Sequence, residues 1–239
     1  MNTFKEHWEK IYSNSVESKF NWAQNVPTTS LQFLDLIHLS IDANIIDVGG
    51  GDSFFVDHLI ELGFKKITVL DISEKAIKRA QLRLGKKSSF INWIVSDINE
   101  FKPNEIYDFW HDRATFHFLK SKEEIDRYFN NANKSISKNG YLMMSTFSDT
   151  GPDQCSGLKV IKYNKNSLTD IFESGFDRVK CVSEDHLTPH GTIQNFIYCL
   201  FKNRIDKTLP IHNQDKMEHI DITYNNMSCD INNRKNCCS

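Results

Sequence analysis

Strand-like and helical patterns alternate from about Asn44 to Phe147, and this alternation limits the possible folds of the chain more than any other feature. Apolar runs typical of buried strands are followed by segments whose apolar residues recur at helical spacing. Such an order is the sequence sign of βαβ units, whose strands lie parallel in one sheet. We therefore predict an α/β fold with a mostly parallel sheet and helices on both faces.

The apolar runs predict seven strands in all. Five are expected in the alternating region, at residues 44–48, 67–72, 90–95, 107–111 and 141–147, and two more at residues 178–182 and 196–201. Pro189-His190-Gly191 lies between the last two and is a turn signal. The sequence therefore predicts a seven-stranded sheet that ends in a C-terminal antiparallel hairpin.

Local end signals predict the helices between these strands. Ser73 is a plausible N-cap for a helix over residues 74–84, and a capping box that begins at Ser121 opens a helix that runs to about Ile136. A further helix is expected over residues 54–62. Asn139-Gly140 is predicted to turn the chain into the fifth strand.

Changes in composition divide the chain into three parts. Residues 1–43 carry scattered aromatic and apolar side chains and are expected to form an N-terminal helical cap that leans over the sheet. Residues 44–202 form the α/β domain itself. Residues 203–239 are rich in asparagine, show little apolar periodicity and are predicted to be a loosely ordered tail.

Charge and cysteine content exclude several classes of partner. A formal net charge of -2 over 239 residues gives no long-range attraction for nucleic acid. No run approaches the ~18 consecutive apolar residues of a membrane span, and the first residues do not resemble a secretion signal, so we expect a cytoplasmic protein. The six cysteines are scattered through periodic segments and the tail, which indicates reduced thiols. No pair has the spacing of a metal site, so no metal is predicted.

Three glycines, Gly49-Gly50-Gly51, directly follow the first predicted strand. In an open α/β sheet this turn lies at the carboxyl end of a strand, where the backbone approaches a ligand closely. The dinucleotide fingerprint needs a third glycine at the position that Phe54 occupies here. Asp52 would also repel a pyrophosphate at the start of the next helix. A cofactor without phosphates therefore fits better.

Acidic residues after the next two strands extend the predicted cofactor site. Asp71 lies at the end of the second strand and is placed to accept hydrogen bonds from two ribose hydroxyls, although alone it fits NAD equally well. Ser96 and Asp97 form an acidic turn for an adenine amino group, and Ile72 and Ile98 are expected to sandwich the ring. The predicted cofactor-binding residues are Trp8, Tyr12, Trp22, Asp47, Gly49, Gly50, Gly51, Ser53, Asp71, Ile72, Ser96, Asp97 and Ile98.

With these motifs the sequence resembles the class I S-adenosylmethionine-dependent methyltransferases. The matching segments are Asp47–Gly51, Val69–Ser73, Ser96–Ile98 and Tyr107–Leu119. The resemblance implies a Rossmann-like sheet, S-adenosylmethionine as the cofactor and residues 44–202 as its binding domain. More narrowly, residues 110–119 are similar to a bacterial-type group of small methyltransferases, and residues 7–12 to relatives of elongation-factor lysine methyltransferases. Gly50 departs from the commoner motif, which has cysteine or threonine between the glycines.

His111, Asp112, Arg113 and His117 are the candidate catalytic residues, because they follow the fourth strand toward the mouth of the site. Methyl transfer mostly needs positioning of the acceptor, with removal of a proton where the acceptor is not already nucleophilic. A histidine can remove that proton, although His117 also suits a structural role. Arg113 could bind an anionic acceptor or pair with Asp112. Trp8, Tyr12 and Trp22 could close over the cofactor or simply pack.

The acceptor is not specified by the sequence, because one fold serves many acceptor atoms. We expect a small molecule or a protein side chain, and the oligomeric state is left open. Cys155 is placed to be part of a lid, and Cys155, His186 and His190 together are a remote candidate for a metal site. Two alternatives to methyl transfer remain at this point: an NAD-dependent oxidoreductase, and a non-catalytic ligand-binding module of the same fold.

Overall fold

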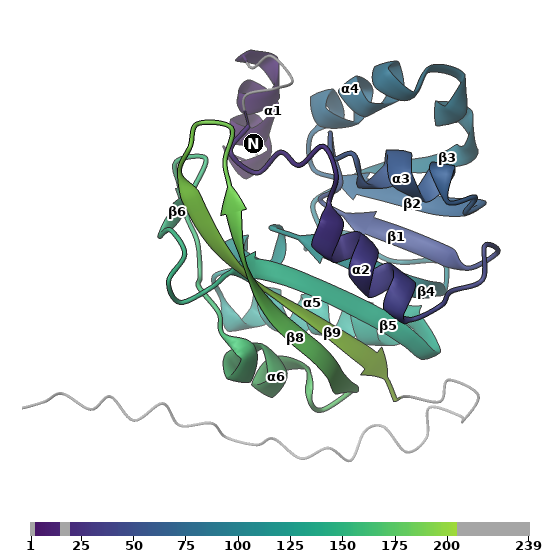
Figure 1. Ribbon diagram of the computed structural model, residues 1–239, viewed down its shortest axis with the longest axis vertical. Coiled ribbons are helices and arrows are strands. Elements are labelled where there is room, and N and C mark those ends of the chain that lie inside the picture. Colours follow the sequence, from purple (N-terminus) through teal and green to yellow (C-terminus); the bar gives the residue numbers. More distant parts are fainter. Residues whose placement is uncertain (1–2, 15–19, 205–239) are drawn as a thin grey trace, which may run out of the picture. The chain divides into compact units, whose positions relative to one another are not determined.

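A single mixed sheet of seven strands forms the centre of the computed structural model, which describes residues 3–14 and 20–204 (Figure 1). The strand order is β3-β2-β1-β4-β5-β9-β8. The strands are β1 (Asn44–Val48), β2 (Lys66–Asp71), β3 (Ile91–Val95), β4 (Tyr107–Arg113), β5 (Ile136–Phe147), β8 (Phe176–Leu187) and β9 (Ile193–Asn203). β1 to β5 pair in parallel, and β9 runs antiparallel to both β5 and β8.

The strand order reverses between β1 and β4. From β1 the chain winds outward through β2 to β3, and it then returns to the other side of β1 to form β4. In open α/β sheets, ligands bind outside the carboxyl ends of the strands at this switch point. The carboxyl ends of β1 and β4 are therefore the place to look for a functional site.

Helices cover both faces of the sheet (Figure 1). They are α1 (Thr3–Asn14), α2 (Thr28–Leu36), α3 (Phe55–Glu61), α4 (Glu74–Leu84), α5 (Lys122–Ser135) and α6 (Lys165–Phe172), with short 3-10 turns at Gly85–Phe90 and Phe116–Phe118. One core cluster joins Trp110 of β4 to Tyr128 of α5 and Phe172 of α6. Another joins Phe109 to Phe33 and Phe55, on α2 and α3. Within the described segments, no helix is long and apolar enough to cross a membrane.

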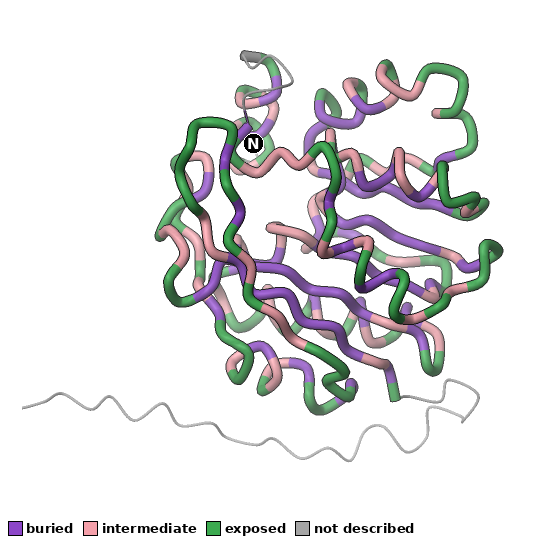
Figure 2. The backbone as a smooth tube through the Cα atoms, viewed as in Figure 1, coloured by how far each residue is buried: buried purple, intermediate pink, exposed green. Residues whose placement is uncertain are grey.

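These observations confirm the predicted fold class, with the mostly parallel sheet, the two helical layers and the C-terminal antiparallel hairpin. The central strands are buried along their length, whereas the edge strand β8 is largely exposed (Figure 2). The predicted N-caps also form: the Ser73 side chain accepts from the Ala76 N–H, and Ser121 makes a capping box with Glu124.

Several boundaries differ from the prediction. β5 begins at Ile136 instead of residue 141, and Asn139-Gly140 lies within it, with Asn139 at a φ of 63° where the register with β4 shifts. Both hairpin strands are longer than expected. β8 is the edge strand and the residues added to it include exposed polar ones, whereas β9 lies between β5 and β8 and is mostly buried. α6 and the two-residue strands β6 (Gln154–Cys155) and β7 (Leu158–Lys159) were not predicted, since short elements carry little periodicity.

The N-terminal segment contains two helices, α1 and α2, as the predicted cap requires. The boundary of that cap at residue 43 stays a prediction. Of the predicted tail, Asn203 still belongs to β9, where its side-chain amide donates to the carbonyl of Ile136, and residues 205–239 lie outside the described part of the chain.

The prediction of reduced thiols is wrong for one pair of cysteines. Cys181 of β8 and Cys199 of β9 form a disulfide. The register of the hairpin places them directly opposite each other, with Cα atoms 4.2 Å apart, which is within bonding reach of two facing strand residues. That register is set by the pairing of two strands and is not visible in cysteine spacing. Cys155 is buried and free.

Candidate functional site

A cavity of about 640 Å³, its open mouth included, lies at the carboxyl ends of β1, β2 and β4. Nine of the predicted cofactor-binding residues line it, namely Trp8, Tyr12, Trp22, Gly49, Asp71, Ile72, Ser96, Asp97 and Ile98. Of the predicted catalytic residues, Arg113 lines it. Lining residues that were not predicted are Phe4, Leu70, Ala114, Thr115 and Phe118, and Cys155, which the sequence placed in a lid, also lines the cavity.

The glycine turn is packed too tightly for side chains. Gly49 has a φ of 68° and its N–H donates to the carbonyl of Leu70, 2.7 Å away. Gly51 has a φ of 38°, and a Cβ there would lie 2.5 Å from Oδ2 of Asp71. Gly50 faces the carboxylate of Asp47 in the same way. Positive φ and close neighbours explain why glycine occupies this turn.

Asp71 is the most strongly perturbed acid of the cavity. Its Oδ1 accepts the N–H of Ser73 at 2.8 Å. The pKa of Asp71 is raised to about 7, mainly by burial and also by the nearby carboxylates of Asp47 and Glu9, whereas its backbone hydrogen bonds lower the pKa. A buried carboxylate at the mouth of a cavity gains most from hydroxyl or amine donors on a ligand.

Aromatic side chains form a wall on one side of the cavity. Phe4, Trp8 and Tyr12 recur at four-residue spacing on one face of α1, and Phe118 packs on this face, with ring centroids 5.6 Å from Phe4 and 5.4 Å from Trp8. The four-residue spacing could have identified Phe4 from the sequence. Trp22 completes the wall from the segment after α1, 5.8 Å from Trp8.

A carboxylate of α1 fixes this helix above the cavity. Oε1 of Glu9 accepts the N–H of Glu74 at 2.7 Å, at the first turn of α4. The unpaired N–H groups of a helix N-terminus favour such an anionic partner. α4 begins directly after the cofactor-side residues Asp71 and Ile72, so the contact ties the aromatic wall to the acidic end of the cavity.

Asp47 and His111 belong to a buried chain of hydrogen bonds. Nδ1 of His111 lies 2.6 Å from Oδ1 of Asp47, and Nε2 lies 2.9 Å from the hydroxyl of Ser30 on α2. All three side chains are almost fully buried, and the second oxygen of Asp47 has no hydrogen-bond partner among the described residues. The arrangement resembles a serine hydrolase triad only in residue types, because Ser30 is inaccessible. It fastens α2 to the sheet beneath the glycine turn.

Asp112 points to the opposite face of the sheet from Arg113. Its Oδ2 accepts the hydroxyl of Tyr128 at 2.7 Å, and its Oδ1 accepts the N–H of Thr115 at 3.0 Å. Burial raises the pKa of Asp112 to about 6. Since strand side chains alternate in direction, Asp112 and its neighbour Arg113 do not pair. The structure places Asp112 in the core that supports the β4 turn.

His117 is also buried and does not line the cavity. Its Nδ1 accepts the N–H of Phe147, and its Nε2 has no partner among the described residues. Burial, together with the nearby charge of Arg113, lowers the pKa of His117 to about 3. The imidazole is therefore neutral near pH 7. Its catalytic role stays a prediction, without a contact to the cavity that supports it.

Arg113 reaches from β4 across the sheet. Its Nε donates to the hydroxyl of Tyr198 on β9 at 3.1 Å, and one terminal nitrogen donates to the carbonyl of Trp22 at 2.9 Å. The guanidinium lies over the ring of Phe196, 4.9 Å from its centre. The other terminal nitrogen is buried and has no hydrogen-bond partner among the described residues.

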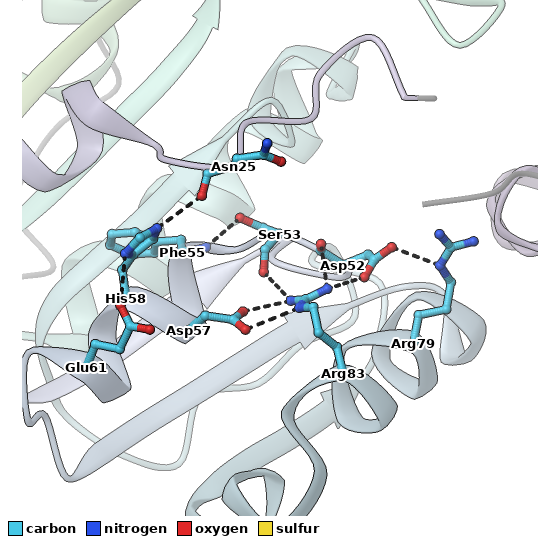
Figure 3. Close-up of polar contacts among 9 residues, drawn as sticks. All are labelled: Asn25, Asp52, Ser53, Phe55, Asp57, His58, Glu61, Arg79 and Arg83. Atoms are coloured by element: carbon cyan, nitrogen blue, oxygen red, sulfur yellow. Dashed lines mark hydrogen bonds and ion pairs between the residues drawn. The ribbon is translucent and has the colours of Figure 1, made fainter. Parts of the chain in front are cut away.

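Two arginines of α4 hold the loop that follows the glycines (Figure 3). Nε of Arg79 lies 2.8 Å from Asp52, and Arg83 pairs with both Asp52 and Asp57, at 2.8 Å from the latter. The backbone carbonyl of Ser53 also accepts from Arg83. The expectation that Asp52 would repel a phosphate is therefore wrong in its premise, because two guanidinium groups balance its charge.

A second cavity of about 540 Å³ lies beside the first and shares Trp22 and Arg113 with it. His111 and Ser53 line this second cavity, as do Phe20 and Ala23. Of the predicted cofactor set, Asp47, Gly50 and Gly51 line neither cavity and underlie the glycine turn instead.

The candidate metal ligands are not brought together. Within the described ranges, no group of three or more His, Cys, Asp or Glu side chains is placed to hold a metal ion. His186 bonds through Nε2 to the carbonyl of Asn21, 2.7 Å away, and His190 lies in the exposed hairpin turn. Burial raises the pKa of Cys155 to about 11, so its thiol is protonated at neutral pH.

Comparison with known proteins gives consistent matches. Residues 39–204 match a family model described as a methyltransferase domain. Malonyl-[acyl-carrier protein] O-methyltransferase 2 of Ilyobacter polytropus is 29% identical over 150 residues, which cover 59% of this chain and 56% of that enzyme. EEF1A lysine methyltransferase 2 of Mus musculus is 24% identical over 182 residues, which cover 72% of this chain and 71% of that protein.

A solved structure shows the same fold. The N-methyltransferase NodS of Bradyrhizobium japonicum, in complex with S-adenosyl-L-homocysteine, superimposes with a TM-score of 0.64 at 21% identity, over 85% of this chain and 99% of that one. The matched region spans just over half the length of the first sequence relative.

Proposed function

Because the chain belongs to the class I S-adenosylmethionine-dependent methyltransferase family, we propose that it is an enzyme that moves the methyl group of S-adenosylmethionine to an acceptor and releases S-adenosylhomocysteine. One observation carries the proposal: the fold gathers Gly49, Asp71, Ile72, Asp97 and Ile98 around one cavity under an aromatic wall. These residues come from the ends of three strands and the loops that follow them, and each belongs to a segment that resembles a motif of the family.

The residues present fit this cofactor. The missing side chain at Gly51 leaves room beside the Asp71 carboxylate, which has acceptor capacity for ribose hydroxyls. Ile72 and Ile98 offer apolar surfaces for an adenine ring, and Asp97 offers an acceptor for its amino group. Trp8, Tyr12 and Trp22 would cover the methionine part. The assignment of these residues to the cofactor is a proposal that mutation can test.

The chain itself would contribute positioning and exclusion of water. When bound, S-adenosylmethionine supplies an electrophilic methyl group on a sulfonium. The aromatic wall and Thr115 would hold reactants in line, which is the main demand of methyl transfer. The protonated thiol of Cys155 is a poor nucleophile, so it would not compete with the acceptor.

No histidine of the described residues lines the first cavity, and this limits the chemistry of proton removal. His111 is engaged on both ring nitrogens, and His117 is buried away from the cavity. We propose that the acceptor arrives already nucleophilic or loses its proton to solvent. His111, Asp112 and His117 would then support the site through the fold, while Arg113 faces the acceptor.

The two alternatives differ in their support. The dinucleotide oxidoreductase is set aside, because the matching family is a methyltransferase domain and Phe54 occupies the position of the third glycine, with its ring under Arg83. A non-catalytic member of the family remains the alternative that only an activity measurement can test.

For the acceptor and the cellular location we propose only broad classes. Relatives named for an acyl-carrier protein and for an elongation factor suggest either a small molecule or a protein as acceptor. A cytoplasmic location and the exclusion of nucleic acid rest on the sequence alone. The Cys181–Cys199 bond gives a reducing compartment no support.

Transfer of labelled methyl groups tests the proposal. The protein is incubated with methyl-radiolabelled S-adenosylmethionine and a desalted cell extract, which is then separated into protein and small-molecule fractions. We expect label in one fraction with the wild type and none with Asp71→Ala. Equal label with both proteins would contradict the site, and tight cofactor binding without any transfer would favour the non-catalytic alternative.

A further inference from the structure

Arg113 carries a partly buried charge that forms no ion pair with an acidic side chain of the described residues. The described ion pairs of the chain do not include it, and its neighbour Asp112 points to the other face of the sheet. Its partners are a tyrosine hydroxyl, a backbone carbonyl and the face of Phe196. A guanidinium with a buried nitrogen left unpaired is unfavourable unless a further acceptor completes its hydrogen bonds.

The position of this guanidinium separates it from the acidic residues assigned to the adenosine part of the cofactor, although it bonds to the carbonyl of Trp22. Asp71 ends β2, whereas Arg113 bonds to Tyr198 and lies over Phe196, both on β9. Arg113 itself belongs to β4, two steps from β2 through β1, or roughly 10 Å, and its side chain extends from there toward β9. The glycine turn for the methionine part follows β1. Arg113 therefore lies on the acceptor side of the cavity.

Electrostatics gives a second reason for an anion here. A guanidinium and a sulfonium in one desolvated site repel each other, and a negative group beside Arg113 would offset this repulsion. Arg113 lines both cavities, so a group bound to it can extend into the second one, which Phe20 and Phe54 also line. Resting on the proposed function, we infer that the methyl acceptor carries a carboxylate that Arg113 binds.

This inference names a substrate class that the family alone does not. A planar guanidinium with one free terminal nitrogen suits a carboxylate oxygen, and a lysine cannot reproduce that fork. The aromatic surroundings favour an acceptor with an apolar body next to the carboxylate. Arg113 would be a substrate-binding residue and not a proton acceptor, since a guanidinium offers N–H donors and no acceptor.

The test uses benzoate as the probe and benzamide as its neutral counterpart, in ligand-observed NMR titrations of the full chain saturated with S-adenosylhomocysteine. We expect the wild type to bind benzoate at least tenfold more tightly than benzamide, and Arg113→Gln to lose this preference. Arg113→Lys should keep part of it, and the exposed Arg127→Gln should keep all of it. Equal binding of the two probes to the wild type, or an unchanged preference in Arg113→Gln, would overturn the inference.

Binding of S-adenosylhomocysteine and of an analogue without the amino-acid part separates the other outcomes. Arg113→Gln should bind S-adenosylhomocysteine and 5′-methylthioadenosine, which lacks the carboxylate, within about twofold of the wild type; this also shows that the variant folds. A tenfold loss for S-adenosylhomocysteine alone would assign Arg113 to the cofactor carboxylate and refute the acceptor role. If the wild type binds neither S-adenosylhomocysteine nor 5′-methylthioadenosine, the proposed function fails. Titration of the free protein with benzoate and benzamide then still tests whether Arg113 binds a carboxylate.

Discussion

At the scale of single residues, the site depends on a carboxylate that the fold holds in an unfavourable state. Asp71 is buried beside the glycine turn, and its pKa is raised to about 7. A ligand that donates hydrogen bonds to the ionised form reverses this penalty. The same residue therefore links cofactor recognition to pH and to the absence of a side chain at Gly51.

Asp71 makes cofactor binding depend on pH. The free protein holds a proton on Asp71 below about pH 7, whereas the complex favours the ionised carboxylate, so binding releases a proton and strengthens as pH rises. Affinity for S-adenosylhomocysteine, measured by calorimetry from pH 5 to 8, should fall toward tenfold per pH unit below about 7. Asp71→Asn should bind more weakly and without this slope. A wild-type affinity that is constant over the range would contradict the assignment.

Gly51→Ala should block the cofactor. The new Cβ would lie 2.5 Å from Oδ2 of Asp71, at a φ of 38° that favours glycine. We expect the affinity for S-adenosylhomocysteine to fall more than tenfold. Gly63→Ala is a matched control, because Gly63 has a φ of 88° with nothing within 4 Å of its added Cβ. The control should lose stability in urea and keep its affinity; a similar loss of affinity in both variants would point to general strain.

At the scale of elements, the site is held by contacts between α1, α4 and the loop after β1. Glu9 of α1 caps α4, and the arginines of α4 hold the loop through Asp52 and Asp57 (Figure 3). The arginine pairs involve side chains that are mostly shielded from solvent, so they are worth more than exposed ion pairs. The aromatic wall and the glycine turn are thus parts of one supported unit.

Arg83→Gln tests this support. Removing the guanidinium leaves Asp57 unpaired and Asp52 with Arg79 alone, and we expect a loss of about 1–3 kcal/mol in the free energy of unfolding. Urea denaturation measures it. The exposed pair of Lys122 with Asp126 on α5 provides the comparison, since Lys122→Gln should change stability by less than about 0.5 kcal/mol. Equal effects of the two variants would show that the loop is not held in this way.

At the scale of the whole molecule, the sequence predicts the architecture and the cofactor end of the site better than the acceptor end. The alternation of strands and helices along the sequence is enough to place Asp71 and Asp97 at the same edge of the sheet. The directions of His111, Asp112 and Arg113 follow from strand alternation, but their partners Ser30, Tyr128 and Tyr198 come from distant elements whose packing no local pattern reveals. The sequence could identify Arg113 as a candidate residue of the site. It could not show that Arg113 forms no ion pair with an acidic side chain of the described residues.

The disulfide was missed for the same reason, because it depends on the register of β8 against β9. Alkylation of the denatured protein without reductant, followed by mass spectrometry, should leave Cys181 and Cys199 unmodified and label Cys155. Reduction should then lower the free energy of unfolding by about 3 kcal/mol, the loop-closure value for a separation of 18 residues. Full alkylation before reduction would show that the thiols are free.

Calorimetric titration with S-adenosylhomocysteine tests the central claim most directly, since the claim is that Asp71 and the glycine turn form the cofactor site of a methyltransferase. The wild type should bind one equivalent, and Asp71→Ala should bind at least tenfold more weakly while unfolding at a similar urea concentration. No binding by the wild type, or equal binding by the two proteins, would contradict it.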